Sequence, residues 1–126
     1  MIQVTITLIL SFILSCCGLN PCMQEEVFRK TSPDNIVDVV VINIDCGVTT
    51  SINNSIFIVP KGELIDKQNP VFVADKVCDL KVKWIKPKFL AISYVKARIF
   101  KFTNFWNSRH IDYFRYEVNI QEERIR

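Results

Sequence analysis

Apolar residues along the body of the chain fall into short runs that are rich in β-branched side chains and are separated by turn residues. No window shows a sustained apolar repeat of 3.6 residues with capping residues at its ends, as an amphipathic helix would. The pattern therefore predicts strands rather than helices. The predicted strands are 36–44, 55–59, 71–73, 80–85, 89–95, 97–102 and 113–120.

One of these segments has the alternation of a strand that is buried on one face only. Leu80, Val82 and Trp84 share a face by the two-residue period of a strand, and lysines occupy the positions between them. The connections between segments are too short for crossover helices, which favours antiparallel pairing. We predict an all-β fold over residues 28–120, a single antiparallel meander or small sandwich of about six to seven strands, followed by a frayed tail at 121–126.

The beginning of the chain has a different pattern. No charged side chain occurs in the first 24 residues, and residues 2–14 form an apolar run with few polar interruptions. The run ends at the small residues 15–18, a form that is typical of an export signal. We assign 1–16 to a hydrophobic signal segment of the lipoprotein type and 17–27 to a tether ahead of the β domain.

Two adjacent cysteines lie where this segment ends. Aliphatic and small residues precede both Cys16 and Cys17, and this arrangement resembles the lipobox of bacterial lipoproteins, in which the cysteine is acylated. Ser15 favours Cys16 and Leu14 favours Cys17, so both stay open. A short uncleaved membrane anchor and a buried N-terminal element are the alternatives. We favour acylation, which predicts an exported protein held in a cell-envelope membrane by lipid, facing the periplasm or the exterior.

Three further cysteines follow at positions 22, 46 and 78. Their spacing contains no Cys-x-x-Cys pair, so no metal site or other cofactor is expected. Disulfides persist in an oxidising compartment, and a Cys22–Cys46 bond would close a loop of about 24 residues, worth roughly 3 kcal/mol. We place Cys22–Cys46 ahead of Cys46–Cys78; the alternative is that Cys46 and Cys78 are small buried apolar residues.

Charge is unevenly distributed, although the 126-residue chain carries a formal net charge of only +3. Residues 81–101 contain seven basic and no acidic side chains. One interpretation of this basic segment is a surface that binds nucleic acid, anionic lipid or an acidic protein. The alternative, which we favour, is the solvated face of strands whose lysines discourage edge pairing. Nucleic acid conflicts with export and is not expected as a partner. The basic residues are Lys81, Lys83, Lys86, Lys88, Lys96, Arg98 and Lys101.

Signs of catalysis are absent from the sequence. The chain lacks a nucleophile elbow, a glycine-rich phosphate loop and a His-Glu-x-x-His motif. Its one histidine, His110, lies in a polar segment and is interpreted as a surface loop residue. The small polar residues of 46–51 are typical of a hydrogen-bonded turn or of a loop that faces a ligand. We predict that the protein is not an enzyme.

Several short motifs between residues 14 and 95 together resemble a family of small bacterial lipoproteins without an assigned activity. That family has a Ser-Pro-Asp-Gly turn and a Cys-Gly-Ala-Thr-Thr motif, and this chain has Asn35 and Val48 where glycine and alanine are usual. The resemblance implies a location and no chemistry. The matching residues are Cys17-Gly18, Cys22, Ser32-Pro33-Asp34, Cys46-Gly47 with Thr49-Thr50, 71–75, Val82-Lys83-Trp84 and 90–94.

We interpret the motif around Cys46 as architectural. A Cys22–Cys46 bond would pin the tether to the sheet, Gly47 would permit an unusual backbone angle, and Thr49 and Thr50 would satisfy backbone groups at the turn.

The leading functional hypothesis is a lipid-anchored domain of the cell envelope that binds a protein partner without catalysis, such as an immunity or inhibitor lipoprotein. It is based on the lack of catalytic motifs and on a small sheet with an asymmetric charge distribution. The alternatives are a structural or stress-related envelope lipoprotein without a dedicated partner, and a small-ligand carrier or enzyme that uses the loop 46–51.

Overall fold

The computed structural model describes residues 22–47, 51–65 and 69–125, and the regular structure of these residues is almost entirely β-strand. The predicted all-β fold is confirmed, although the described residues form more strands than predicted. The elements are β1 (Met23–Thr31), β2 (Val37–Asp45), β3 (Asn53–Pro60), β4 (Phe72–Cys78), β5 (Lys81–Lys86), β6 (Phe89–Tyr94), β7 (Lys96–Phe102), β8 (Phe105–Trp106), the 3₁₀ turn η1 (Asp112–Phe114) and β9 (Val118–Arg124).

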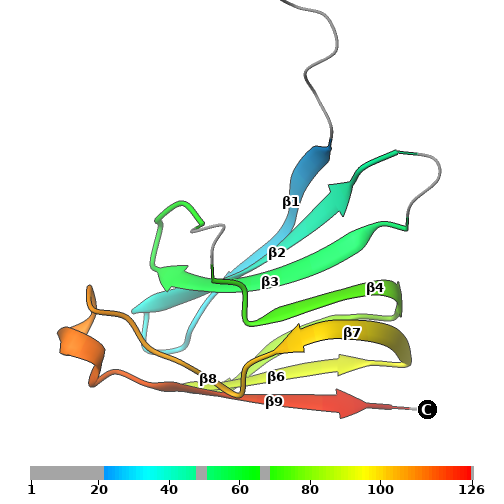
Figure 1. Cartoon of the computed structure of the whole chain (residues 1–126). Helices are drawn as coiled ribbons and strands as arrows, with labels where there is room; N and C mark the ends of the chain where they lie inside the picture. The colour runs from blue at the N-terminus through cyan, green and yellow to red at the C-terminus, as the bar shows by residue number, and fades with distance from the viewer. Residues whose placement is uncertain (1–21, 48–50, 66–68, 126) are drawn as a thin grey trace, which may run out of the picture.

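The strands form two sheets that pack face to face as a sandwich (Figure 1). The five-stranded sheet has the order β1-β2-β3-β4-β7, and the four-stranded sheet has the order β5-β6-β9-β8. The chain leaves the first sheet after β4, returns to it for β7 and then leaves it again. Of the two predicted architectures the sandwich is therefore right and the single meander is wrong. The physical reason is that a sheet with one apolar face needs a second layer to cover it.

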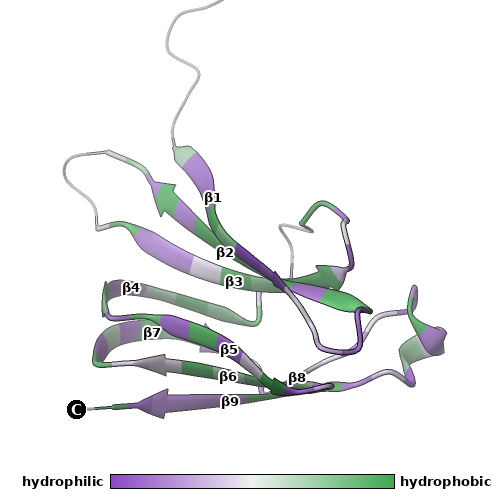
Figure 2. Cartoon of the chain, turned by 180° about the vertical axis from the view of Figure 1, so that it is seen from behind, coloured by the Kyte–Doolittle hydropathy of each residue, from purple (hydrophilic) through white to green (hydrophobic). Residues whose placement is uncertain are grey.

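The core lies between the sheets and is made by alternate residues of the inner strands. Val37, Val39 and Val41 of β2 face inward, and Leu90 and Ile92 of β6 meet them from the opposite sheet; all five are at most 3 % exposed. Trp84 is buried in the same core, and Leu80 and Val82 pack against it, as their shared face predicts. The alternating hydropathy of the strands is visible in Figure 2.

A second, smaller apolar cluster lies on the outer face of the five-stranded sheet. Val40, Ile42, Phe57 and Val59 are buried there, and Ile65 of the segment after β3 packs against them. These strands are therefore apolar on both faces, which explains why their sequences read as nearly continuous apolar runs.

Strand β1 corrects the predicted tether. Residues 23–27 were assigned to a tether, yet they pair with β2 from Met23 opposite Asp45 onward. The first six residues of β1, 23–28, are all exposed. Their sequence therefore did not need the alternation of apolar residues that reveals a buried strand. Backbone pairing with β2 holds this edge strand, and the register shifts at a bulge beside Val27.

The C-terminal part of the chain also differs from the prediction. β6 and β9 pair in parallel, with Phe89 opposite Asn119 and Tyr94 opposite Arg124. The connection between them passes through β7 in the other sheet, which provides the length that a parallel crossover needs. The frayed tail is therefore wrong for residues up to 124, because the backbone pairs with β6.

The predicted strand 113–120 is only partly a strand. Asp112, Tyr113 and Phe114 have φ angles of 52°, 48° and 67° and form the turn η1, and β9 begins at Val118. The aromatic residues gave this segment a strand-like composition, but the turn points them away from the core.

Parts of the sequence predictions lie outside the described residues. They include the signal segment 1–16, the lipidation candidates Cys16 and Cys17, and Thr49 and Thr50. Within the part of the chain that the structure describes, no helix has the length and apolar character needed to cross a membrane.

Candidate functional site

The predicted disulfide is present. Cys22 precedes β1 and Cys46 follows β2, so their bond joins the open end of the β1–β2 hairpin. The alternative Cys46–Cys78 pairing is wrong, and Cys78 is a free thiol on the surface rather than a small buried residue. Gly47 has a φ of 130°, a backbone angle that favours glycine, and its amide donates to the Asp45 carboxylate at 3.1 Å. The bond secures an edge strand that has little apolar burial of its own.

The Ser32-Pro33-Asp34 segment is the turn between β1 and β2. The Ser32 hydroxyl donates to the Asp34 carboxylate and accepts hydrogen bonds from the amides of Ile36 and Val37. Tyr116, which precedes β9, donates its hydroxyl to the same carboxylate. Asn35 adopts a φ of 67°, which asparagine tolerates well. The turn thus joins the two sheets at one end of the sandwich, which is a structural role.

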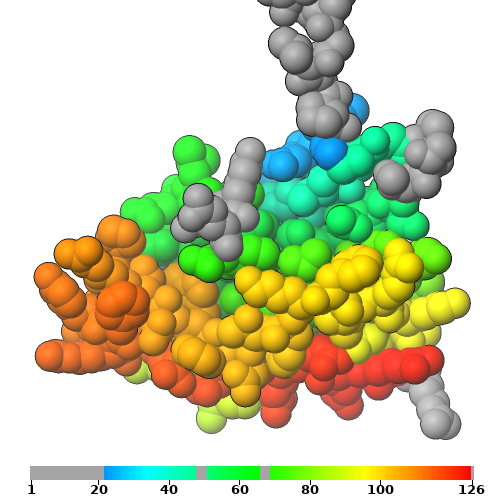
Figure 3. Space-filling model, viewed as in Figure 1, coloured from blue at the N-terminus to red at the C-terminus, as the bar shows by residue number. Residues whose placement is uncertain are grey.

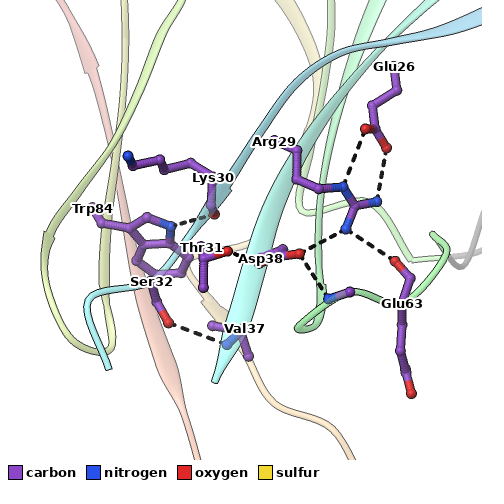
Figure 4. A network of polar contacts seen from close by, with 10 residues as sticks. Glu26, Arg29, Lys30, Thr31, Ser32, Val37, Asp38, Glu63 and Trp84 are labelled. Carbon is purple, nitrogen blue, oxygen red and sulfur yellow. Dashed lines mark hydrogen bonds and ion pairs between the residues drawn. The ribbon is translucent and has the colours of Figure 1, made fainter. Parts of the chain in front are cut away.

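A polar network on the outer face of the five-stranded sheet is built around Asp38, which is 2 % exposed (Figure 4). Its carboxylate accepts hydrogen bonds from the Thr31 hydroxyl at 2.6 Å, the Arg29 guanidinium at 2.9 Å and the Gly62 amide at 3.0 Å. Arg29 also pairs with Glu26 and donates to the Glu63 carbonyl.

Burial opposes ionisation of Asp38, but the hydrogen bonds from Thr31, Gly62 and Arg29 outweigh it and lower its pKa. Three hydrogen bonds therefore hold this buried carboxylate in its ionised form. The network ties the loop after β3 to the sheet, so we interpret it as structural.

The basic residues divide between edge strands of the two sheets. Each of these edge strands, β5 and β7, also contains a register shift, and lysines and bulges both discourage pairing with another chain. Arg98 is already engaged, because it forms a double hydrogen bond with the buried Asp75. The arrangement favours the interpretation of these residues as solvated strand edges. Lys81, Lys83 and Lys86 lie on β5 with Lys88 in the turn after it, and Lys96, Arg98 and Lys101 lie on β7.

An open cleft of about 470 Å³ lies between the sheets, at the edge formed by β1 and β5. Its walls are mainly apolar, and its polar groups are Lys81 and a pair of asparagine side chains, Asn43 and Asn54, that hydrogen-bond to each other. Neither Cys46 nor Ser51 is among the residues that line it, so the cleft is not the predicted ligand-facing loop. Its apolar walls are formed by Val27, Phe28, Val41, Leu80 and Val82.

Exposed aromatic residues surround the turn η1, at the end of the sandwich remote from Asn43 and Asn54. Tyr113 is 73 % exposed and Phe114 is 52 % exposed. Phe114, Phe105 and Trp106 line a hollow of about 320 Å³. Figure 3 shows β7 and the projecting η1 segment on the same face of the molecule.

The turn η1 holds three successive residues at positive φ, which costs roughly 1–2 kcal/mol for each non-glycine residue. Local hydrogen bonds maintain this shape. The Ser108 carbonyl accepts from the amides of Ile111 and Phe114, at 3.2 and 3.1 Å, and Asn107 donates its side-chain amide to the Phe114 carbonyl. Strained backbone of this kind is concentrated at functional sites in proteins.

Sequence reasoning missed both of these surfaces. Tyr113 and Phe114 were assigned to a strand, although Asn107, Ser108 and Asp112 around them are typical turn residues. Asn43 was included in an apolar strand, and the sequence offers no signal for its face, because Asp38 interrupts the same run on the opposite face of the sheet.

His110 is an exposed loop residue, as predicted, and it lines a smaller hollow beside Trp106. Among the described residues, no three His, Cys, Asp or Glu side chains come close enough to hold a metal ion together.

Comparison of the chain with models of protein families, with curated proteins and with solved structures finds no match in any of the three. The geometry of the molecule is therefore the basis for any functional assignment.

Proposed function

We propose that this chain is a lipid-anchored domain of the bacterial cell envelope that binds a protein partner and has no catalytic activity, in the manner of an immunity or inhibitor lipoprotein. The observation that carries the proposal is the exposed aromatic pair Tyr113 and Phe114 on the strained turn η1. Exposed aromatic side chains beside a hollow are typical of the central contacts of protein interfaces.

The charges around the turn indicate the chemistry of the partner. Lys101 lines the hollow beside Phe114, and Arg109 and Arg115 are exposed on either side of the turn. Asp112 is the acidic residue within η1 itself. We therefore propose a partner with an apolar contact surface and an acidic rim, for which the basic residues would increase the association rate.

The disulfide supports the proposed location. A Cys22–Cys46 bond suits an oxidising compartment outside the cytoplasm, and the uncharged apolar leader of the sequence suits export. The turn η1 lies far from the start of β1 in the sandwich (Figure 1). A lipid on Cys16 or Cys17 would therefore leave the aromatic end directed away from the membrane, where a partner has access.

Site-specific photo-crosslinking in cells tests the partner. A photoreactive phenylalanine at position 113 is expected to form one discrete adduct with a protein. The same group at Ile85, which is 54 % exposed on β5, serves as the matched control and is expected to form none. Equal products at both positions, or no adduct at 113, would contradict partner binding and favour the envelope lipoprotein without a dedicated partner.

Metabolic labelling with a fatty acid tests the anchor. The wild-type chain is expected to incorporate label, and the double variant Cys16→Ala, Cys17→Ala is expected to lose it. Labelling that persists in the double variant, or is absent from the wild type, would rule out the lipid anchor.

A further inference from the structure

The free side of strand β1 is an exposed sheet edge whose sequence is complementary to itself. β1 is the outermost strand of the five-stranded sheet (Figure 1), and the unpaired N–H and C=O groups of such an edge can pair with a strand of another chain. Acidic residues lie in its first half and basic residues in its second half, with two apolar residues between them. Reversal of the strand therefore places acid against base. The residues in chain order are Glu25, Glu26, Val27, Phe28, Arg29 and Lys30.

The bulge beside Val27 brings complementary charges onto a shared face. Glu25 and Lys30 are five positions apart, a separation that puts side chains of a regular strand on opposite faces. Here the register shift adds one residue between them. Lys30 lies opposite Val39 and Glu25 lies opposite Asn43, and these two residues of β2 are four positions apart on its inner face. Glu25 and Lys30 are therefore on the same face of β1.

The second pair of charges shares the outer face for the same reason. Glu26 lies opposite Ile42 and Arg29 lies opposite Val40, and both of these β2 residues belong to the outer apolar cluster. The Arg29 guanidinium already pairs with the Glu26 carboxylate at 2.9 Å within one copy of the chain. Each face of the edge thus carries one acid and one base.

The backbone groups of the edge have matching directions. Ser32 donates its amide to the Val37 carbonyl at 2.8 Å, so its backbone groups point toward β2. Because these groups alternate in direction along a strand, those of Arg29, three positions earlier, point to the free edge. Ile42 is five positions after Val37, so it points toward β3, and Glu26, its register partner, also points to the free edge. Glu26 of one copy and Arg29 of another can therefore form a hydrogen-bonded antiparallel pair.

We propose that β1 is the interface of a symmetric dimer, in which β1 of a second copy pairs with it antiparallel. Two-fold symmetry makes each pair of opposite residues occur twice. The bulges of the two strands face each other, so the register is the same on both sides of them. The interface does not include the aromatic turn η1, and the dimer does not depend on the proposed function. The opposite residues are Glu25 with Lys30, Glu26 with Arg29, and Val27 with Phe28.

Charge and apolar contact both favour this pairing. Within the described residues neither Glu25 nor Lys30 forms an ion pair, so both are available to a second copy. Val27 and Phe28 are 46 % and 40 % exposed, and the pairing removes part of this surface from water. Trp84 contacts the Lys30 carbonyl, which the alternation of the backbone directs toward β2, so this contact leaves the free edge open.

The distribution of charge disfavours other pairings of edges. A parallel pair of β1 strands would place each acid beside an acid, and like charges directly opposite each other are destabilising. The edge strands β5 and β7 carry basic residues and no acid, so neither is complementary to itself. On β5, the edge next to β1, Lys81 and Lys83 alternate with Val82 and Trp84, which pack in the core. The two lysines therefore point away from β1 and its contact.

Sedimentation equilibrium of the full chain tests the dimer, in a parent protein that carries Cys16→Ala, Cys17→Ala and Cys78→Ser to prevent lipidation and disulfide-linked dimers. This parent is expected to form dimers with a dissociation constant on the order of 100 µM or lower. Glu25→Lys and Lys30→Glu are each expected to weaken association about tenfold or more, because each puts like charges opposite one another at two symmetric places.

A mixture of these two variants gives the sharpest result. The Glu25→Lys chain and the Lys30→Glu chain are complementary to each other, because the mixed pair again sets every lysine opposite a glutamate. The equimolar mixture is expected to form heterodimers as tightly as the parent forms dimers. Glu117→Lys and Lys61→Glu are the matched controls at exposed positions outside β1, and both are expected to associate as the parent does. Far-ultraviolet circular dichroism checks that each variant is folded.

The proposal is overturned if the parent is monomeric at concentrations on the order of 1 mM. Equal association of the parent and both charge variants would also overturn it, because association would then belong to another surface or to the apolar leader. A mixture of the two variants that stays monomeric would contradict the antiparallel register. None of these results depends on crosslinking at position 113, so the dimer and the proposed partner binding can fail independently.

Discussion

The indole N–H of Trp84 donates a hydrogen bond to the backbone carbonyl of Lys30 at 3.0 Å, across 54 positions of sequence. Trp84 belongs to β5 and Lys30 to β1, and each strand is the edge of its own sheet. This contact closes one side of the sandwich. The open cleft lies farther along the same two strands, at Phe28 and Val82, so Trp84 also marks where the space between the sheets begins.

Replacement of Trp84 by phenylalanine is expected to lower the free energy of unfolding by roughly 1–3 kcal/mol, because the Lys30 carbonyl loses its donor while most of the apolar contact is kept. Urea unfolding at neutral pH measures the change. Trp106→Phe is the control, since the Trp106 indole forms no hydrogen bond among the described residues, and it is expected to cost less. A larger loss at Trp106 would contradict the importance of the β1–β5 contact.

Removal of the disulfide is expected to lower stability by roughly 2–5 kcal/mol in either Cys22→Ala or Cys46→Ala. The double variant should lose little more than either single variant, because all three lack the same bond. Urea unfolding of the oxidised proteins tests this. Additive losses in the double variant would show that the two cysteines act separately.

Acid is expected to destabilise the protein through Asp38. Its pKa is lower in the folded than in the unfolded chain, so its stabilising effect is complete above the ordinary pKa of aspartate and is lost as the pH falls through the folded value. Asp38→Asn is expected to lower stability at pH 7 by about 2 kcal/mol and to flatten the stability profile below roughly pH 5. Urea midpoints measured from pH 7 downward give the result, and an unchanged acid slope in the variant would contradict it.

The exposed thiol of Cys78 is expected to react with a maleimide in the absence of reductant, whereas Cys22 and Cys46 should react only after reduction and unfolding. Peptide mapping after labelling identifies the modified residues. A Cys78→Ser variant is the control, and its peptide that contains position 78 should carry no label. Labelling of Cys46 in the native, unreduced protein would contradict the disulfide.

Local pattern was sufficient to identify much of the sheet structure. The β-branched residues of β2 and β3 and the alternation of Leu80, Val82 and Trp84 predicted strands where strands occur, because side chains that alternate across a strand reveal its buried face in sequence. The Cys22–Cys46 bond was also predicted, since few pairings were available and the position of each cysteine beside a strand or leader was visible in sequence.

The candidate site on η1 could not be predicted in the same way. Tyr113 and Phe114 have strand-forming side chains, and only hydrogen bonds to Ser108 and Asn107 hold them in a turn with positive φ. Propensity describes one residue at a time, whereas this turn depends on the combination of several contacts.

The sequence by itself determined the fold class and the faces of the apolar strands, because both depend on residue types that are close together in the chain. It also favoured the Cys22–Cys46 disulfide, because only a few cysteine pairings were possible. Only the tertiary structure decided that β1 is a strand, that β6 and β9 run parallel, and that Asn43 and Lys81 border one cleft with Val27 and Val82. These features arise where two sheets meet, and the partners of each strand lie far away along the chain. Exposed edge strands such as β1 take their order from backbone pairing, which leaves little mark on the pattern of apolar and polar side chains.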